Sequence, residues 1–220
     1  SVFHYLVFAH NLGGKGSTSG ISRGSGSGAS DFIASLGSWS GQLGTDLEQA
    51  GTLMHELGHN LGLRHSGVPD PNDTNYKPNY LSVMNYAFQT KGLIIGGHEG
   101  NLDYSRFALP TLDENALDEQ LGLDGGPSIA QFGTRYWCGM DKERLATSPT
   151  AIDWNCDGDA QDTNVRANIN EGRFNVHDTV LGTLPSYNDW QNLVFTGGAI
   201  GQPGAQPVLP ESTAVHEITQ

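Results

Sequence analysis

The sequence predicts an α+β fold, and three observations support this class. Two segments near the N-terminus have the aromatic and β-branched composition of strands. A capped amphipathic helix follows the second of them directly. The chain of 220 residues also contains 30 glycines and 10 prolines, and its later part predicts a loop-rich half. A chain of this length can bury one substantial core.

The predicted strands are residues 1–10 (SVFHYLVFAH) and residues 30–39 (SDFIASLGSW). The first is apolar enough to be a buried strand. Between them, residues 13–28 are rich in glycine and serine, and we expect a mobile surface loop there. This loop lacks the Gly-Lys-Ser/Thr spacing of a phosphate-binding loop, so we do not expect a nucleotide site.

The predicted helix covers residues 46–61. Thr45 and Glu48 have the spacing of a capping box, in which each side chain accepts a hydrogen bond from the backbone of the other. Apolar residues then recur at steps of three and four, which is typical of a helix that packs on a core: Leu47, Ala50, Met54, Leu57 and Leu61. Gly62 can adopt the positive φ that would turn the chain sharply after the helix.

Histidines in and after this helix have the spacing of metal ligands. His55 and His59 are four residues apart and therefore lie on one face, and a turn at Gly62 would bring His65 toward them. Three neutral imidazoles leave the fourth zinc position open, as in a catalytic site. Glu56 is placed to take a proton from water. The alternative is that these are ordinary polar residues on a half-exposed helix.

The pattern His55-Glu56-x-x-His59-x-x-Gly62-x-x-His65, with Met84 in the segment YLSVMNYAF, resembles the metzincin clan of zinc metallopeptidases. The resemblance implies a small upper mixed β-sheet, an active-site helix and a loop-rich lower half. It also implies zinc ligands at the three histidines, Glu56 as the general base and a Met-turn at Met84. Tyr86 matches a tyrosine that ligates zinc or stabilises the transition state in some members. The alternative for Tyr86 is a packed aromatic.

By the same resemblance, residues 1–125 form the zinc catalytic core, and residues 126–220 form a loop-rich C-terminal part packed on it. Only 54 residues precede His55, fewer than in most metzincins, so we expect either a reduced upper part or a processed or longer precursor. Members of the clan pair extended substrate with an edge strand. Here that edge would be residues 31–36, although an ordinary sheet strand is the alternative.

The expected function is therefore a secreted zinc endopeptidase that hydrolyses peptide bonds through a zinc-bound water activated by Glu56. Its partner would be a protein or peptide bound extended along the cleft. A net charge of −13 argues against nucleic acid, and no segment is apolar enough for a membrane span. The alternative is a catalytically silent extracellular binding module stabilised by calcium and zinc. The sequence does not define an oligomeric state.

The C-terminal part predicts a disulfide and a calcium loop. Cys138 and Cys156 are expected to pair in a secreted protein, the alternative being two buried thiols. Acidic and amide side chains at alternate positions, with a glycine, match the start of a calcium loop: Asp153, Asn155, Asp157, Asp159 and Asp162. The alternative is a solvated acidic turn that binds no metal. Asn164 replaces the glutamate that closes an EF-hand. Residues 109–123 predict an acidic helix with a solvated face, and residues 186–195 predict a short packed helix or strand.

Overall fold

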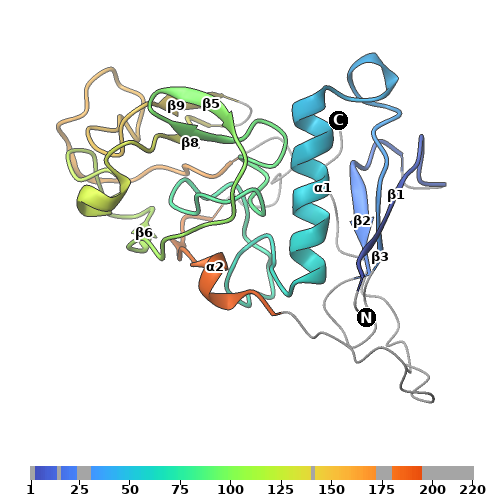
Figure 1. Ribbon diagram of the computed structural model, residues 1–220. Coiled ribbons are helices and arrows are strands. Elements are labelled where there is room, and N and C mark those ends of the chain that lie inside the picture. The colour runs from blue at the N-terminus through green and yellow to red at the C-terminus, as the bar shows by residue number, and fades with distance from the viewer. Residues whose placement is uncertain (1–2, 14–15, 24–30, 140–141, 172–179, 195–220) are drawn as a thin grey trace. The chain divides into compact units, whose positions relative to one another are not determined.

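The structure is a computed structural model in which two compact units are distinguished (Figure 1). Unit 1 comprises residues 1–64 and 191–220, and unit 2 comprises residues 65–190. The structure describes residues 3–13, 16–23, 31–139, 142–171 and 180–194. Helices and several small sheets occur together, which confirms the α+β class in a general sense. Across these described ranges, no helix has both the length and the apolar character needed to cross a membrane.

Unit 1 contains a small mixed sheet of β1 (Tyr5–Phe8), β2 (Gly20–Ser22) and β3 (Asp31–Ala34). The strand order is β1-β3-β2, with β3 parallel to β1 and antiparallel to β2. The expectation that residues 31–36 form the free edge is therefore wrong, because β3 is bonded on both sides. The outer strand β2 arises inside the segment expected to be a mobile loop.

The first strand is also more exposed than its composition predicts. Tyr5, Val7 and Phe8 are 62%, 53% and 57% exposed, so the expectation of a buried strand is wrong for the described residues. The reason is position, because β1 is an outer strand whose partner in the described sheet is β3. Apolar composition predicted the strand conformation correctly but could not predict which sheet position the strand occupies.

The predicted helix is confirmed as α1 (Asp46–Asn60), which follows a short 3-10 helix, η1 (Ser40–Gln42). Both hydrogen bonds of the capping box are present: the Glu48 amide donates to Thr45 Oγ1 at 3.2 Å, and the Thr45 amide donates to Glu48 Oε2 at 2.6 Å. At the other end Gly62 has a φ of 91°. The amide of Leu63 bonds back to the Gly58 carbonyl at 2.9 Å, so the helix stops where the sequence predicts.

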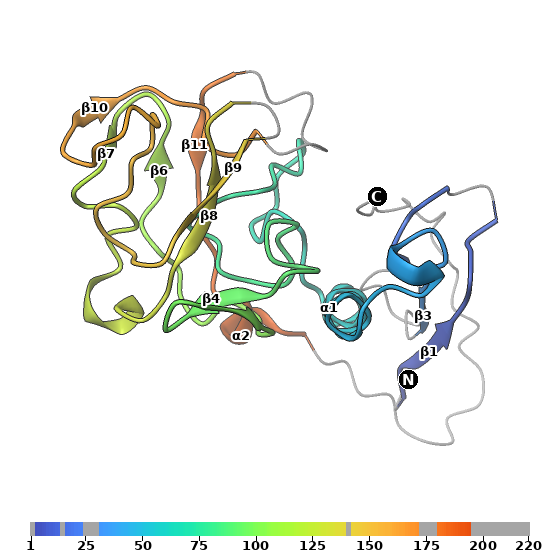
Figure 2. The ribbon, with the colours of Figure 1, turned by 90° about the horizontal axis from the view of Figure 1, so that it is seen from above.

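Helix α1 lies along the sheet of unit 1, beside β3 in Figure 2, and it contacts both β2 and β3. Its buried face differs from the predicted apolar stripe, whose members are half-buried or, for Ala50, exposed. Polar contacts explain part of the difference, since Ser22 Oγ of β2 donates to Asn60 Oδ1 at 2.6 Å. The buried residues of the helix are Gly51, Thr52, His55, Glu56, Gly58, His59 and Asn60.

In the part of unit 2 that the structure describes, the strands form four antiparallel pairs joined by turns. The pairs are β4 (Leu93–Ile95) with β5 (His98–Asn101), β6 (Leu112–Asp113) with β11 (Thr183–Leu184), β7 (Leu117–Asp118) with β10 (Thr163–Val165), and β8 (Thr134–Trp137) with β9 (Glu143–Ala146). The 3-10 helix η2 spans Gly126–Ile129, and α2 spans Asp189–Asn192, inside the segment predicted to form a short packed element. Fully buried apolar side chains form its core, among them Phe88, Leu123, Ile129, Trp154 and Ile169.

The predicted acidic helix over residues 109–123 is wrong. The segment instead repeats the motif Leu-Asp-Glu, at residues 112–114 and 117–119, and each repeat forms a short strand followed by a glutamate. Neither glutamate is solvated, because the side chains of Glu114 and Glu119 are fully buried. Backbone amides from distant parts of unit 2 donate hydrogen bonds to these carboxylates. Glu114 and Glu119, which the sequence predicted to be solvated, are therefore buried acceptors that connect segments of unit 2.

Candidate metal centre

The helix places the first two histidines as their spacing predicts. The rings of His55 and His59 are 4.7 Å apart between centroids, and their Nε2 atoms are 3.1 Å apart. Both side chains are buried. The Nδ1 atom of His59 lies 3.0 Å from the carbonyl oxygen of Leu63, in the turn that ends the helix. With Nδ1–H donating to that oxygen, Nε2 keeps a lone pair for a metal.

The third histidine follows the Gly62 turn and is also buried, with 1% of its surface exposed. Its Nδ1 lies 2.7 Å from Asp73 Oδ2. The hydroxyl of Tyr86 lies 3.4 Å from His65 Nδ1 and 3.3 Å from Nε2, and the two rings are 4.5 Å apart. Tyr86 is thus close to a predicted ligand, whereas Asp73 was missed because nothing in its sequence position marks it.

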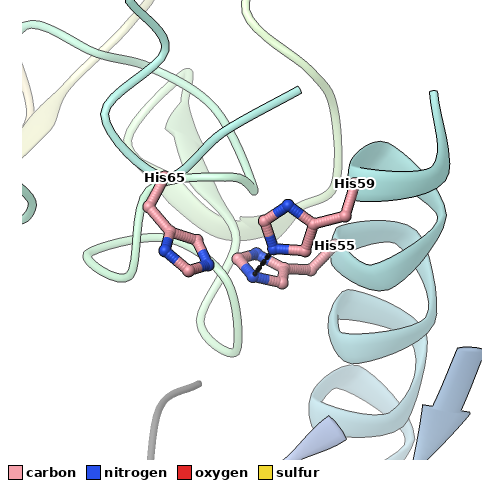
Figure 3. Close-up of side chains that lie close together, drawn as sticks. All are labelled: His55, His59 and His65. Carbon is pink, nitrogen blue, oxygen red and sulfur yellow. Dashed lines mark hydrogen bonds between the residues drawn. The ribbon is translucent and has the colours of Figure 1, made fainter. Parts of the chain in front are cut away.

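The three histidines belong to one continuous segment, residues 55–65, and their side chains approach one another (Figure 3). One nitrogen from each of His55, His59 and His65 lies within 4.8 Å of the others. Imidazole nitrogens suit zinc, and three of them leave room for a fourth ligand. The residues therefore fit the ion that the motif predicts. Among the described residues, one further group of three potential ligands occurs, and it lies in unit 2.

Glu56 is fully buried in unit 1, next to strand β2. A Cβ atom added to Gly20 would lie 2.3 Å from Glu56 Oε1 and 2.7 Å from the carbonyl oxygen of Ile33. Real Cβ atoms do not approach other atoms so closely, so glycine is required where β2 passes the carboxylate. The general base predicted from the motif is thus held beside the outer strand of the sheet.

The segment predicted to form the Met-turn is buried and hydrogen-bonded in unit 2. Met84 is fully buried, and its amide donates to Ser82 Oγ at 3.0 Å. Asp189, in α2, accepts hydrogen bonds from Tyr80 Oη at 2.7 Å and from Ser82 Oγ at 2.5 Å. Burial raises the pKa of Asp189, partly offset by these hydrogen bonds. Helix α2, which the sequence predicted only as a short packed element, therefore holds this turn through Asp189.

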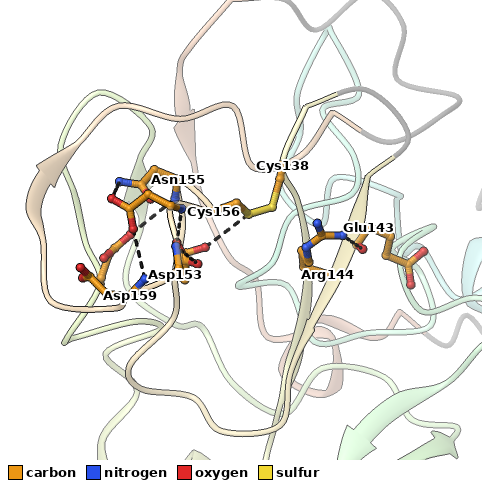
Figure 4. The surroundings of a disulfide bond; sticks show 10 residues. Cys138, Glu143, Arg144, Asp153, Asn155, Cys156 and Asp159 are labelled. Atoms are coloured by element: carbon orange, nitrogen blue, oxygen red, sulfur yellow. Dashed lines mark hydrogen bonds between the residues drawn. A yellow bond between two sulfur atoms is a disulfide. The ribbon is translucent and has the colours of Figure 1, made fainter.

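The disulfide between Cys138 and Cys156 is present and joins the residue after β8 to the acidic loop (Figure 4). Acidic side chains of the loop accept hydrogen bonds from its own backbone: the Asp153 carboxylate accepts from the amides of Asp157 at 3.1 Å and Gly158 at 3.0 Å. Carboxylate oxygens of Glu119, Asp159 and Asp162 lie within 4.8 Å of one another. Glu119 was not among the predicted ligands. Calcium at this loop stays a prediction.

Comparisons of the chain with models of protein families, with curated proteins and with solved structures found no match. The histidine motif of residues 55–65 and the proximity of its three imidazoles are therefore the features from which a function can be inferred.

Proposed function

We propose that this protein is a zinc-dependent endopeptidase that resembles the metzincins. The observation that carries the proposal is the gathering of His55, His59 and His65, whose ligand atoms lie within 4.8 Å of one another. The contacts of His59 and His65 through Nδ1 add support, because oxygen acceptors at that atom favour metal binding through Nε2. The disulfide supports a secreted location, since such bonds persist in oxidising compartments.

When bound, zinc would act as a Lewis acid toward the scissile carbonyl and lower the pKa of water. We assign Glu56 as the general base: its carboxylate takes a proton from the attacking water as the new C–O bond forms. Glu56 then gives this proton to the amine nitrogen as the C–N bond breaks. We assign Tyr86 to hold the developing oxyanion, since its hydroxyl lies near the His65 ring.

Strand β2 is the element we propose to bind substrate, in place of β3. It is the outer strand on its side of the described sheet, and Gly20 brings it against the Glu56 carboxylate. An extended peptide could add to such a strand through backbone hydrogen bonds, which do not depend on side-chain identity. This mode suits an endopeptidase that accepts varied unfolded segments.

The proposal is tested with casein as an unstructured substrate, using wild type and Glu56→Gln in parallel and measuring the zinc content of both. We expect Glu56→Gln to retain zinc and to lose at least a factor of about 100 in kcat/KM, because the amide cannot accept the proton. Glu48→Gln is the matched control, since glutamine preserves a capping box on the same helix.

Failure of the role assigned to Glu56 can be distinguished from failure of the peptidase proposal as a whole. Full cleavage by Glu56→Gln would contradict the role of this carboxylate while leaving a peptidase. Zinc bound at one equivalent with no cleavage by wild type would instead favour a binding module stabilised by metal.

A further inference from the structure

The candidate ligands His59 and His65 differ in the acceptor that lies next to Nδ1, the nitrogen that would not bind the metal. A neutral imidazole carries one N–H, and the partner of that N–H decides which nitrogen stays available as a ligand. For His59 the partner is a neutral backbone carbonyl, that of Leu63, at 3.0 Å. For His65 it is a carboxylate, Asp73 Oδ2, at 2.7 Å.

The loop after His65 is ordered so that it delivers this carboxylate. The side chain of Asp70 accepts hydrogen bonds from the amides of Asn72 at 2.9 Å and Thr74 at 3.0 Å. The amide of Asp73 donates to the Asp70 carbonyl at 3.1 Å, and Asp73 has a φ of 49°. Aspartate tolerates this left-handed conformation better than most residues. The turn therefore directs the Asp73 side chain back to the His65 ring.

The surroundings of the pair suit a charged acceptor. The His65 side chain is 1% exposed, whereas that of Asp73 is 47% exposed. The imidazole is shielded from competing water, and the carboxylate remains solvated enough to hold its charge. Tyr86 Oη is farther from Nδ1, at 3.4 Å, so it is the weaker candidate for orienting the ring.

We propose that Asp73 is a positioning residue for the zinc centre. It accepts Nδ1–H of His65, fixes the tautomer that presents Nε2, and increases the basicity of that nitrogen through its negative charge. This inference rests on the proposed function, because it assigns Asp73 a purpose only if His65 binds a metal.

The test measures zinc affinity by competition with a chromophoric chelator for wild type, Asp73→Asn, Asp73→Ala and Asp73→Glu. Loss of a partner of this kind typically costs 10- to 100-fold in metal affinity. We expect a loss of about 10-fold for Asp73→Asn, which still accepts the hydrogen bond without charge, and of about 100-fold for Asp73→Ala. Asp73→Glu should recover part of the loss.

Asp124→Ala is the matched control. It removes the carboxylate of an exposed turn residue in unit 2 whose left-handed φ of 47° is close to the 49° of Asp73. A second measurement follows the ring nitrogens of His65 by NMR in metal-free protein, where Asp73→Ala should lower the population of the Nδ1–H tautomer. A purely structural role would change the melting temperature and leave this population unaltered.

The outcomes separate the inference from the proposed function. Wild-type zinc affinity in Asp73→Ala, or an equal loss in Asp124→Ala and Asp73→Ala, would overturn the inference and leave the peptidase proposal standing. Wild type that binds no zinc and cleaves no casein would overturn both.

Discussion

At the scale of single residues, the candidate site depends on positions that the sequence alone does not mark. Such positions are recognised only from the residues that lie beside them in the folded chain. Gly20 lies in a segment of glycine and serine where no position stands out by sequence. In the structure it is the point at which β2 passes the Glu56 carboxylate. One methyl group there would compete for space with the Glu56 carboxylate and with the backbone of the adjacent strand.

We therefore expect Gly20→Ala to reduce peptidase activity by more than a factor of about 10, because a displacement of roughly 1 Å at a reacting group can cost far more than that. The same change should lower the free energy of unfolding by about 1–3 kcal/mol through overpacking. Casein hydrolysis and urea unfolding measure the two effects. Gly13→Ala is the control, since a Cβ there meets nothing within 4 Å. Unchanged activity in folded Gly20→Ala would exclude the proposed placement of Glu56.

At the scale of elements, the local signals that define the ends of helix α1 and its two histidines were reliable, whereas distant pairings could not be predicted. The capping box, the one-face placement of His55 and His59 and the Gly62 turn all depend on contacts within five residues, which the sequence displays directly. The central position of β3 depends on β1 and β2, which lie on opposite sides of it in space. Asp73 could not be identified either, because its partner is fixed by a loop whose hydrogen bonds have no simple sequence signature.

The repeated Leu-Asp-Glu segment is the clearest case of an element that sequence reasoning misassigned. Glu114 accepts from the amides of Ile169 at 2.9 Å and Gly182 at 2.9 Å, and Glu119 accepts from the amides of Asn155 at 3.4 Å and Asp162 at 3.1 Å. Each carboxylate thus connects two later parts of the chain to its own strand. A helical pattern of charges could not reveal this, because the donors are backbone groups.

We expect Glu114→Gln to lower the free energy of unfolding by about 1–3 kcal/mol. Glutamine has one acceptor oxygen in place of two, so either the buried amide of Ile169 or the half-buried amide of Gly182 loses its partner. Urea unfolding of wild type and variant gives the difference. Asp124→Asn is the control, because it is an exposed turn residue whose left-handed φ of 47° asparagine also tolerates. Equal stability of Glu114→Gln and wild type would show that these hydrogen bonds contribute little.

At the scale of the whole molecule, a buried lysine connects distant segments of unit 2, as the disulfide also does. Lys77 Nζ donates to the carbonyl oxygens of Ser66 and Pro185, each at 2.5 Å, and so connects the beginning of unit 2 to its end. Burial lowers the pKa of Lys77 from 10.5 to about 8, although Asp70, Asp73 and Asp189 oppose this shift. The folded protein therefore carries a charge that burial disfavours at neutral pH.

This pKa predicts how stability depends on pH. Below about pH 8 both folded and unfolded chains bind the proton, and the cost of burying the charge is fully present. Between about pH 8 and 10.5 the unfolded chain holds more protons than the folded one, so the contribution of Lys77 to stability rises with pH. We expect the unfolding free energy of wild type relative to Lys77→Met to increase by roughly 2 kcal/mol from pH 7 to pH 10. A difference that stays constant or falls would contradict the buried, charged state.

The glutamate anchors of unit 2 also set the order in which the protein can acquire structure. Their backbone donors lie between 36 and 68 residues farther along the chain. Helix α1 needs only neighbours within a few residues, so it can form early during synthesis, whereas unit 2 requires slow closure of long loops. A nascent chain that has not reached Gly182 cannot complete the contacts of Glu114. Completion of unit 2 is thereby deferred until nearly the whole described chain exists.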